Sequence, residues 1–316
     1  MEGKKMPRSV LVIMGGTSSE REISLKSGEA MYKALCNKGY NAEKFILNAD
    51  NCGEIIVKKP DLAVLALHGK CGEDGTIQGL LELAGIPYTG SKVASSAMCM
   101  DKIITKKMFE QSHIPTAKYI CVFRGETPDF PSLAKKAVSE LGLPLVVKAP
   151  CQGSSVGVKI VKTSGELPKV LEEIYQYDNE LLIEEFLPGT ELTVPLMEDE
   201  NGVKALPVIE IVSENEFYDF ESKYAPGMSH HIIPARIPDD IMSETSALAV
   251  QAYKALLCNG VARVDFILGA DGKPRAVEIN TIPGMTATSL VPDAAAYLGI
   301  SFDDLVDMIV KTSGEK

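Results

Sequence analysis

Near its C-terminus the chain reads Val261-Ala-Arg-Val-Asp-Phe-Ile-Leu268, then Asp271-Gly272, then Arg275-Ala-Val-Glu-Ile-Asn280. Apolar and polar side chains alternate along both outer runs, which is the period of a strand with one buried face. Asp-Gly between two such runs is a strong signal for a tight turn, because these residues tolerate the positive φ angles of hairpin turns. The sequence therefore predicts a β-hairpin with its turn centred on Asp271-Gly272.

A turn at this place sets the register of the two strands. It puts Asp265 opposite Glu278 and Arg263 opposite Asn280, and successive side chains point to opposite faces of a strand. One face of the hairpin should therefore carry a polar cluster. The other face is predicted to be apolar and to consist of Val264, Phe266, Val277 and Ile279.

The two opposed carboxylates predict a cation site. Directly opposed side chains have Cβ atoms about 5 Å apart, where like charges repel one another unless a cation lies between them. Oxygen ligands of Asp, Glu and Asn suit Mg²⁺, which proteins usually hold through one or two carboxylates and substrate phosphates. The alternative is the solvated outer face of an amphipathic hairpin.

Composition is that of an ordinary globular protein. The 316 residues allow two or three domains, and a net charge of −11 argues against a nucleic-acid-binding surface. We expect neither export nor a membrane role, because no signal-peptide core and no apolar run of roughly 20 residues is present. Seven cysteines without a C-x-x-C pair indicate reduced thiols rather than disulfides or a zinc site.

The N-terminal third repeats a pattern of strand, glycine turn and helix. Ser9–Met14 ends in glycines before a helical pattern, and Asp61–Leu67 ends in His68-Gly69 before another. The carboxyl ends of parallel strands form the ligand-binding edge of open α/β folds. Glu20 and His68 are expected there, although Glu20 could simply favour a helix dipole and His68 could be a cap or core residue.

A glycine-rich segment, Cys151-Gln-Gly-Ser-Ser-Val-Gly157, follows the predicted strand Leu145–Lys148. Backbone N–H groups of such a loop can surround phosphates, and a lysine beside it adds positive charge. The Walker A order is absent, so an ordinary hairpin loop is the alternative. Carboxylates of the predicted strand Leu181–Phe186 could accept from an adenine amine or a ribose hydroxyl. Cys151 is expected to react with thiol reagents and to be protected by Mg-ATP.

A long polar connection, Ser213–His230, is predicted to be a lid. Connections of this length are usually functional lids or disordered segments, and its aromatic residues argue against disorder.

Pro283-Gly-Met285 predicts a tight turn, and the hydroxyls of Thr286-Ala-Thr-Ser289 could begin a helix or hold a carboxylate. Further predicted elements are helices at Thr76–Leu83, Ser91–Met100, Pro131–Leu141, Gly165–Tyr175 and Ile241–Cys258, and strands at Ala117–Phe123, Val158–Val161, Glu191–Met197, Val203–Val212 and His231–Ala235.

Ten short motifs occur along the chain: Gly15-Gly-Thr-Ser-Ser-Glu-Arg-Glu22, Leu67-His-Gly69, Gly72-Glu-Asp-Gly-Thr76, Met100-Asp-Lys102, Gly153-Ser-Ser-Val-Gly157, Phe217-Tyr-Asp219, Lys223-Tyr224, Arg263-Val-Asp265, Glu278-Ile-Asn280 and Pro283-Gly-Met285. In these motifs and their order, the chain closely resembles the D-alanine-D-alanine ligases of the ATP-grasp superfamily. The resemblance runs from Gly15 to nearly the C-terminus.

The resemblance implies an α/β, three-domain ATP-grasp fold with an N-terminal parallel-sheet domain. We expect domains at 1–101, 102–188 and 189–316, with the lid at 213–230 and ATP between the antiparallel sheets of the last two. It also implies a cytoplasmic homodimer that joins two D-alanine molecules for peptidoglycan precursor synthesis, with ATP as a substrate and two Mg²⁺ or Mn²⁺ ions. Neither nucleic acid nor a membrane is an expected partner.

By position, the resemblance assigns an ATP site. Lys102 and Lys148 would hold phosphates, while Glu184, the backbone to Leu187 and Glu191 would take adenine and ribose. The full ATP set would be Lys102, Lys148, Gly153, Ser154, Ser155, Glu184, Glu185, Phe186, Leu187, Glu191 and Lys223.

The resemblance also assigns metal and substrate sites. Glu20 would bind the ammonium group of the first D-alanine, with His68 nearby, and Ser289 would receive the carboxylate of the second. Arg263 and the Gly284 backbone would stabilise oxyanion charge. The metal ligands would be Asp265, Glu278 and Asn280.

Lys223 and Tyr224 would close the lid, with Tyr224 hydrogen-bonded to Ser154 and through it to Glu20. One alternative is a non-catalytic sensor of ATP or amino acids, which the complete set of charged site residues disfavours because a buried carboxylate cluster is costly. The other is a ligase for D-lactate or D-serine. Tyr224 favours D-alanine, since depsipeptide-forming relatives tend to differ at this lid position.

Overall fold

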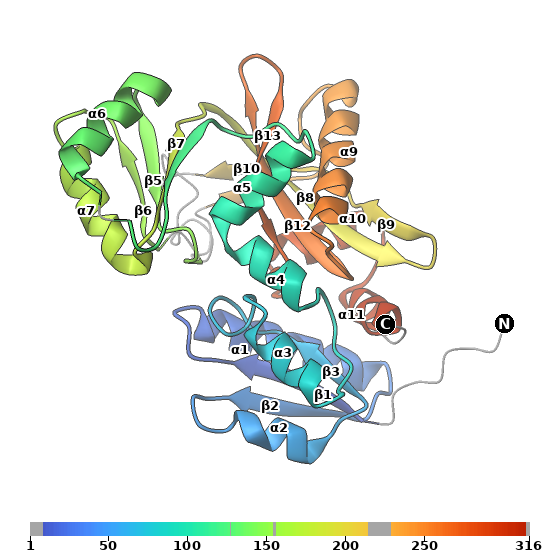
Figure 1. Cartoon of the computed structure of the whole chain (residues 1–316). Coiled ribbons are helices and arrows are strands. Elements are labelled where there is room, and N and C mark those ends of the chain that lie inside the picture. The colour runs from blue at the N-terminus through green and yellow to red at the C-terminus, as the bar shows by residue number, and fades with distance from the viewer. Residues whose placement is uncertain (1–8, 127, 154–155, 214–228, 314–316) are drawn as a thin grey trace.

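Three β-sheets organise the chain in the part that the computed structural model describes, which is residues 9–126, 128–153, 156–213 and 229–313. The first sheet is parallel and lies in the N-terminal unit at the bottom of Figure 1. The other two sheets are antiparallel. This division agrees with the expected parallel N-terminal domain followed by two antiparallel sheets.

The parallel sheet has the strand order β2-β1-β3, and every residue of the central strand is buried. A parallel strand covered on both faces needs a continuous apolar run, which Val10-Leu-Val-Ile-Met14 supplies. Strand β2 and helix α2 were not predicted. In β2 only Phe45 and Leu47 are buried, so the apolar pattern of this strand is short. The elements are β1 (Val10–Gly15), α1 (Arg21–Asn37), β2 (Ala42–Leu47), α2 (Cys52–Lys58), β3 (Leu62–Leu65), α3 (Thr76–Leu83) and α4 (Val93–Met100).

The second sheet has the strand order β4-β7-β5-β6. Helices α6 and α7 pack together on its face that is turned away from the rest of the molecule (Figure 1), and apolar side chains of the strands and both helices form one core there. Strands β5 and β6 have the predicted bounds, whereas α5 was not predicted. The elements are α5 (Lys102–Gln111), β4 (Tyr119–Val122), α6 (Phe130–Leu141), β5 (Leu145–Lys148), β6 (Val158–Val161), α7 (Leu167–Asp178) and β7 (Leu181–Glu185).

The third sheet has the order β11-β10-β8-β12-β13, with β9 paired to β8. Helix α9 covers one face through buried residues such as Ala249 and Ala252. The single strand predicted at Val203–Val212 is wrong, because Pro207 cannot donate to a strand ladder and the run is split in two. The elements are β8 (Gly189–Asp199), β9 (Gly202–Ala205), β10 (Ile209–Ser213), β11 (Ser229–Ile232), α9 (Asp239–Ala255), β12 (Val261–Gly269) and β13 (Pro274–Asn280).

The β12–β13 hairpin contains both predicted polar pairs, Arg263 with Asn280 and Asp265 with Glu278. Nearer the turn the register shifts, and Phe266 pairs with Ala276 instead of Val277. A β-bulge at Val277 absorbs one residue, because the turn between Gly269 and Lys273 is one residue longer than predicted. The prediction that Val277 belongs to the apolar face is therefore wrong: Ala276 is fully buried, whereas Val277 is half-buried.

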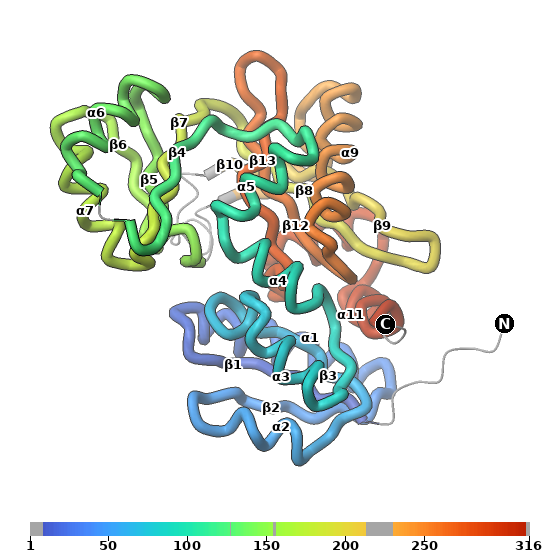
Figure 2. The backbone as a smooth tube through the Cα atoms, in the orientation of Figure 1, coloured from blue at the N-terminus to red at the C-terminus, as the bar shows by residue number. Residues whose placement is uncertain are grey.

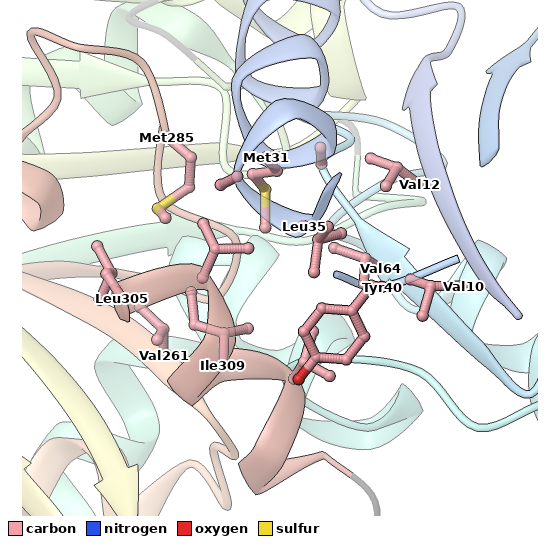
Figure 3. Close-up of a cluster of buried hydrophobic side chains, with 14 of the residues drawn as sticks. Val10, Val12, Met31, Leu35, Tyr40, Val64, Val261, Met285, Leu305 and Ile309 are labelled. Atoms are coloured by element: carbon pink, nitrogen blue, oxygen red, sulfur yellow. The ribbon is translucent and has the colours of Figure 1, made fainter. Parts of the chain in front are cut away.

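Two C-terminal helices, α10 (Leu290–Tyr297) and α11 (Phe302–Thr312), return to the N-terminal unit. Helix α11 packs against α1, and its residues Leu305 and Ile309 share a core with Met31 of α1 (Figure 3). Both ends of the chain thus contribute to one hydrophobic core. In the part of the chain that is described, no helix is both long and apolar enough to cross a bilayer.

The backbone passes from the N-terminal unit to the second sheet through α4 and α5 and enters the third sheet in β8 (Figure 2). Both α4 and α5 also contact β13. The domain limits 1–101, 102–188 and 189–316 stay predictions. Residues 214–228 of the predicted lid lie outside the described residues, and its ends belong to β10 and β11.

Truncation of Leu305 to alanine should lower the free energy of unfolding by about 3 kcal/mol, because it empties a fully buried site between α11 and α1. Leu298→Ala is the control, since Leu298 is 51% exposed and should change stability by less than about 0.5 kcal/mol. Urea unfolding followed by circular dichroism measures both. Equal effects of the two substitutions would contradict the shared core.

Candidate active site

A cavity of about 1020 Å³ opens between the three units. Small-molecule sites commonly measure roughly 300–1,000 Å³, so this one has room for a nucleotide beside a small second substrate. All predicted site residues that the structure describes line this cavity: Glu20, His68, Lys102, Lys148, Gly153, Glu184, Glu185, Phe186, Leu187, Glu191, Arg263, Asp265, Glu278, Asn280, Gly284 and Ser289.

The remaining predicted residues, Ser154, Ser155, Lys223 and Tyr224, lie outside the described part of the chain. Gly153, which precedes Ser154 in the chain, lines the cavity, and its carbonyl accepts the Val156 N–H at 3.0 Å. The predicted hydrogen bonds from Tyr224 to Ser154 and on to Glu20 therefore stay predictions.

Glu20 lies at the start of α1 with a side chain that does not cap its own helix. Two glycines approach its carboxylate: a Cβ at Gly153 would lie 2.6 Å from Glu20 Oε2, and a Cβ at Gly69 would lie 2.8 Å from it. Gly69 has a φ of +68°, which favours glycine there, whereas at Gly153 a side chain would have to displace the Glu20 carboxylate. The carboxylate is thus enclosed by a loop of the N-terminal unit and by the glycine-rich loop, where it can hold an ammonium group.

His68 follows β3 and is buried. Its Nε2 lies 3.2 Å from Ser27 Oγ, which also accepts the Met285 N–H at 3.2 Å. Burial lowers the pKa of His68, although the nearby charge of Glu20 acts in the opposite direction, so the ring is neutral at physiological pH. Ser27, which His68 contacts, therefore links the N-terminal unit to the turn that contains Gly284.

Glu73 is a buried carboxyl group that the sequence analysis does not select. The Gly69 N–H donates to its Oε2 at 2.5 Å, and it lines the same cavity. Burial raises the pKa of Glu73 to about 8, and the charge of Glu20 adds to this shift. Glu73 belongs to the motif Gly72-Glu-Asp-Gly-Thr76, but a carboxylate in a polar loop has the sequence pattern of a turn or capping residue.

The polar face of the hairpin combines two carboxylates with two cations. Arg263 holds Asp265 in a bidentate pair, with Nε–Oδ1 and NH2–Oδ2 distances of 2.8 Å. The hydroxyl of Thr193 donates to Asp265 Oδ1 at 2.6 Å, and the ammonium of Lys102 lies 3.7 Å from Glu278 Oε2. Cations of the protein therefore offset the repulsion between the opposed carboxylates.

The oxygen atoms on this face fit the divalent ions that the sequence implies. Asp265, Glu278 and Asn280 provide hard ligands suited to Mg²⁺ or Mn²⁺. A carboxylate has about four acceptor positions, so the pair with Arg263 leaves Asp265 able to bind a metal. Asn280 Oδ1 accepts the Ile282 N–H at 3.0 Å, which fixes the amide. Binding of the ions at these three residues stays a prediction.

A second group of possible ligands, Asp101, Cys151 and Glu180, lies beside the glycine-rich loop. It suits a hard cation poorly. Burial, with the charge of Asp101 adding to it, raises the pKa of the Cys151 thiol to about 12, and Asp101 Oδ1 already accepts from Ile103 N–H and Ile104 N–H. Ready reaction of Cys151 with thiol reagents is not expected from this structure, because a protonated thiol is a poor nucleophile.

Lys102 lies where the glycine-rich loop meets the start of α5. Its ammonium donates to the Gln152 carbonyl at 2.8 Å. The loop is anchored by Asp178, which accepts from Cys151 N–H at 2.8 Å and from Gln152 Nε2 at 2.6 Å. A lysine beside a glycine-rich loop is an arrangement that binds phosphate.

Glu184 is a buried carboxylate between two lysines. Lys148 contacts its Oε2 and Lys106 contacts its Oε1. Burial alone would raise the pKa of Glu184, but the two ammonium groups outweigh it and lower the pKa to about 2. Lys106 is absent from the predicted set. Its spacing of four residues from Lys102 could have indicated a shared helix face, but α5 itself was not predicted.

The sequence predicts that carboxylates of the strand around Glu184 face a nucleotide. The structure differs from this prediction at Glu185. The carboxylate of Glu185 accepts the Lys118 N–H at 2.9 Å and is therefore directed to the residue that precedes the neighbouring strand β4. Phe186, Leu187 and Glu191 continue the cavity wall. The Glu185 N–H also donates to the Lys118 carbonyl at 3.0 Å, so both groups of Glu185 are bonded to the neighbouring chain segment.

Ser289 immediately precedes α10. Its Oγ accepts the Thr286 N–H at 3.0 Å and lies 2.8 Å from Thr286 Oγ1. A Cβ at Gly284 would lie 2.9 Å from this Oγ, so the turn approaches the serine hydroxyl closely. Hydroxyl groups at a helix N-terminus suit an anionic group such as a carboxylate.

Family models match most of the chain. The model described as D-ala D-ala ligase C-terminus matches residues 108–311, and the one described as D-ala D-ala ligase N-terminus matches residues 44–91. The chain belongs to the D-alanine-D-alanine ligase family.

Full-length relatives of this family agree with the assignment. The D-alanine-D-alanine ligase of Pelotomaculum thermopropionicum is 49% identical over 312 residues, or 98% of each chain. That of Carboxydothermus hydrogenoformans is 47% identical over 300 residues, or 95% of this chain and 96% of the relative. The solved D-alanine-D-alanine ligase from Bacillus anthracis complexed with ATP has a TM-score of 0.82 at 38% identity and 97% coverage of both chains. The expected α/β fold of this family is therefore confirmed.

Glu73→Gln should stabilise the protein more at pH 8.5 than at pH 5. The folded-state pKa of Glu73 is about 8, above the ordinary value of 4.5, so the folded state binds the proton more tightly and loses stability as pH rises through this window. Glutamine cannot ionise. In thermal melts across this pH range, the difference in melting temperature between Glu73→Gln and wild type should grow with pH. The exposed control Glu54→Gln should show a constant difference. A constant difference for Glu73→Gln as well would refute the raised pKa of Glu73.

Asp265→Asn should preserve folding but lower Mg²⁺-dependent turnover about a hundredfold or more, because a bound metal ion contributes several kcal/mol of transition-state stabilisation. Turnover measured against Mg²⁺ concentration tests this. Asp271→Asn, at the tip of the same hairpin and paired with Arg275, is the control and should behave as wild type. Near-normal activity of Asp265→Asn at low Mg²⁺ would remove Asp265 from the metal site.

Proposed function

We propose that the chain joins two D-alanine molecules into D-alanyl-D-alanine and releases ADP and phosphate. Its family supports the reaction class, an ATP-dependent, ADP-forming ligase of peptidoglycan synthesis that uses divalent metal ions. The observation that carries the proposal is the convergence of Glu20, Lys148 and the polar hairpin face on one cavity. That cavity combines a carboxylate for an ammonium group with lysines for phosphates.

The chemistry follows from the weakness of a carboxylate as an acyl donor. In the first step the γ-phosphoryl group of ATP passes to the carboxylate of one D-alanine, which gives an acyl phosphate and ADP. The deprotonated amine of the second D-alanine then attacks the acyl carbon, and phosphate leaves as the C–O bond breaks. Asp265, Glu278 and Asn280 would hold metal ions, which when bound neutralise charge on a transferring phosphoryl group.

The side chains around the cavity have separate roles in this scheme. Glu20 pairs with the ammonium of the first D-alanine and so selects the molecule that is activated. Arg263 and the Gly284 N–H stabilise the oxyanion of the tetrahedral species, and the bidentate pair with Asp265 fixes the guanidinium in advance. Ser289 binds the carboxylate of the second D-alanine.

The proposal also includes the lid, the cellular location, the oligomeric state and the domain limits. Lys223 and Tyr224 would close over the site and exclude water that hydrolyses the acyl phosphate, and Tyr224 favours D-alanine over D-lactate or D-serine as second substrate. The protein would work in the cytoplasm as a homodimer, with domains at 1–101, 102–188 and 189–316.

Phosphate release from ATP tests the proposed function. The purified protein is incubated with ATP, Mg²⁺ and D-alanine, L-alanine, D-lactate or D-serine, and the organic product is identified by mass spectrometry. The expected result is rapid phosphate release and a dipeptide with D-alanine, and little product with the others. Absence of D-alanyl-D-alanine, or an equal rate with L-alanine, would contradict the proposal.

Glu20→Gln should lower kcat/KM for the first D-alanine at least tenfold, because loss of one charge-assisted contact costs roughly 2–4 kcal/mol. Steady-state kinetics over a range of D-alanine concentrations separates the two substrate sites. Glu22→Gln is a matched control, since Glu22 is exposed in the first turn of the same helix. Unchanged kinetics for Glu20→Gln would exclude Glu20 from the first substrate site.

A further inference from the structure

A buried lysine lies in the cavity wall beside Glu184 and has no role in the proposed reaction so far. The side chain of Lys106 is 1% exposed, and its ammonium contacts Glu184 Oε1, Thr116 Oγ1 at 2.6 Å and the Ala117 carbonyl at 3.4 Å. An ammonium has three N–H donors, so these contacts use its full capacity. Burying a charge is costly even when it is paired, which argues for a specific task.

Lys148 is held far less firmly. Its side chain is 12% exposed, and its ammonium contacts Glu184 Oε2. Glu184 is the one hydrogen-bonding or ion-pairing partner of this ammonium within residues 9–126, 128–153, 156–213 and 229–313. Two lysines thus share one carboxylate, which leaves a surplus positive charge at the cavity wall. An entering polyphosphate can attract Lys148, whereas Lys106 remains bonded to the protein.

Lys106 also connects the two antiparallel sheets. Thr116, which accepts from Lys106, donates its hydroxyl proton to the Ala276 carbonyl of β13 at 2.6 Å. The Ala276 N–H in turn donates to the Pro115 carbonyl at 2.8 Å. Glu184 belongs to β7 of the second sheet, so its carboxylate is fixed through Lys106 and Thr116 to the third sheet.

We propose that Lys106 is a positioning residue for nucleotide selectivity: it holds one oxygen of Glu184, so that the other oxygen accepts the 6-amino group of adenine once Lys148 turns to the phosphates. This inference rests on the proposed function, which assigns ATP to the cavity. Lys106 itself does not touch the nucleotide. A 6-oxo purine would present a lone pair, instead of an N–H, to the fixed carboxylate oxygen and would be rejected.

Kinetics of dipeptide formation with ATP and with inosine triphosphate, which has a 6-oxo group, test the inference. Wild type should prefer ATP. Lys106→Met should lower kcat/KM for ATP about tenfold through KM, the loss expected for one hydrogen bond to a charged group, and change the value for inosine triphosphate little. Lys107→Met is the matched control, because Lys107 is the exposed neighbour on α5 and lies over the Phe123 ring; it should match wild type.

A double substitution separates positioning from a merely structural role. In a Glu184→Gln background, Lys106→Met should not change the ratio of ATP to inosine triphosphate efficiency any further. A structural role would lower the melting temperature and both efficiencies together. If Lys106→Met does not fold, Thr116→Val replaces it as the test, because it removes the acceptor that fixes Lys106. Thr116→Val should lower the ratio of ATP to inosine triphosphate efficiency about threefold.

Three results would overturn the inference: equal use of the two nucleotides by wild type, an unchanged ratio in folded Lys106→Met, or, where that variant is unfolded, an unchanged ratio in Thr116→Val. Failure of the proposed function has a different signature, since wild type would then form no dipeptide with either nucleotide. In that event calorimetric affinities of the same variants for ATP and inosine triphosphate give the same comparison without turnover.

Discussion

The repulsion between Asp265 and Glu278 is the constraint on which the rest of the site depends. Their strands place them opposite one another, and two like charges at this spacing destabilise a hairpin unless cations accompany them. Arg263 satisfies Asp265 from the same strand, and Lys102 approaches Glu278 from the start of α5. These ion pairs thereby hold the third sheet and α5 beside the glycine-rich loop.

A second charge cluster, formed by Glu184, Lys106 and Lys148, also lines the cavity. Lys106 and Lys148 offset the burial of Glu184 so fully that its pKa is about 2. The two clusters differ in sign: the hairpin offers oxygens that can bind cations, while the lysines around Glu184 leave positive charge for phosphates. A nucleotide with its metal ions complements both, and this complementarity explains why one cavity can bring ATP and an amino acid together.

Much of this arrangement could be predicted from the sequence because it depends on local patterns. The pairing of Asp265 with Glu278 was predicted correctly although the turn is one residue longer, since the bulge at Val277 restores the register. Strand β2 was missed because its alternation is weak. The burial of Glu73 and Lys106 could not be predicted, because it follows from packing between distant segments. The four-residue spacing of Lys102 and Lys106 indicates only a shared helix face.

We infer that this cavity activates a carboxylate by phosphorylation. Positional isotope exchange tests it most directly: ATP labelled with ¹⁸O in the β,γ-bridge is incubated with the protein, D-alanine and an analogue that fills the second site without attacking. Reversible formation of an acyl phosphate predicts movement of the label from the bridge to non-bridging β-phosphate positions, dependent on D-alanine. An unscrambled label with both ligands bound, together with no phosphorylated substrate that can be trapped, would contradict the account.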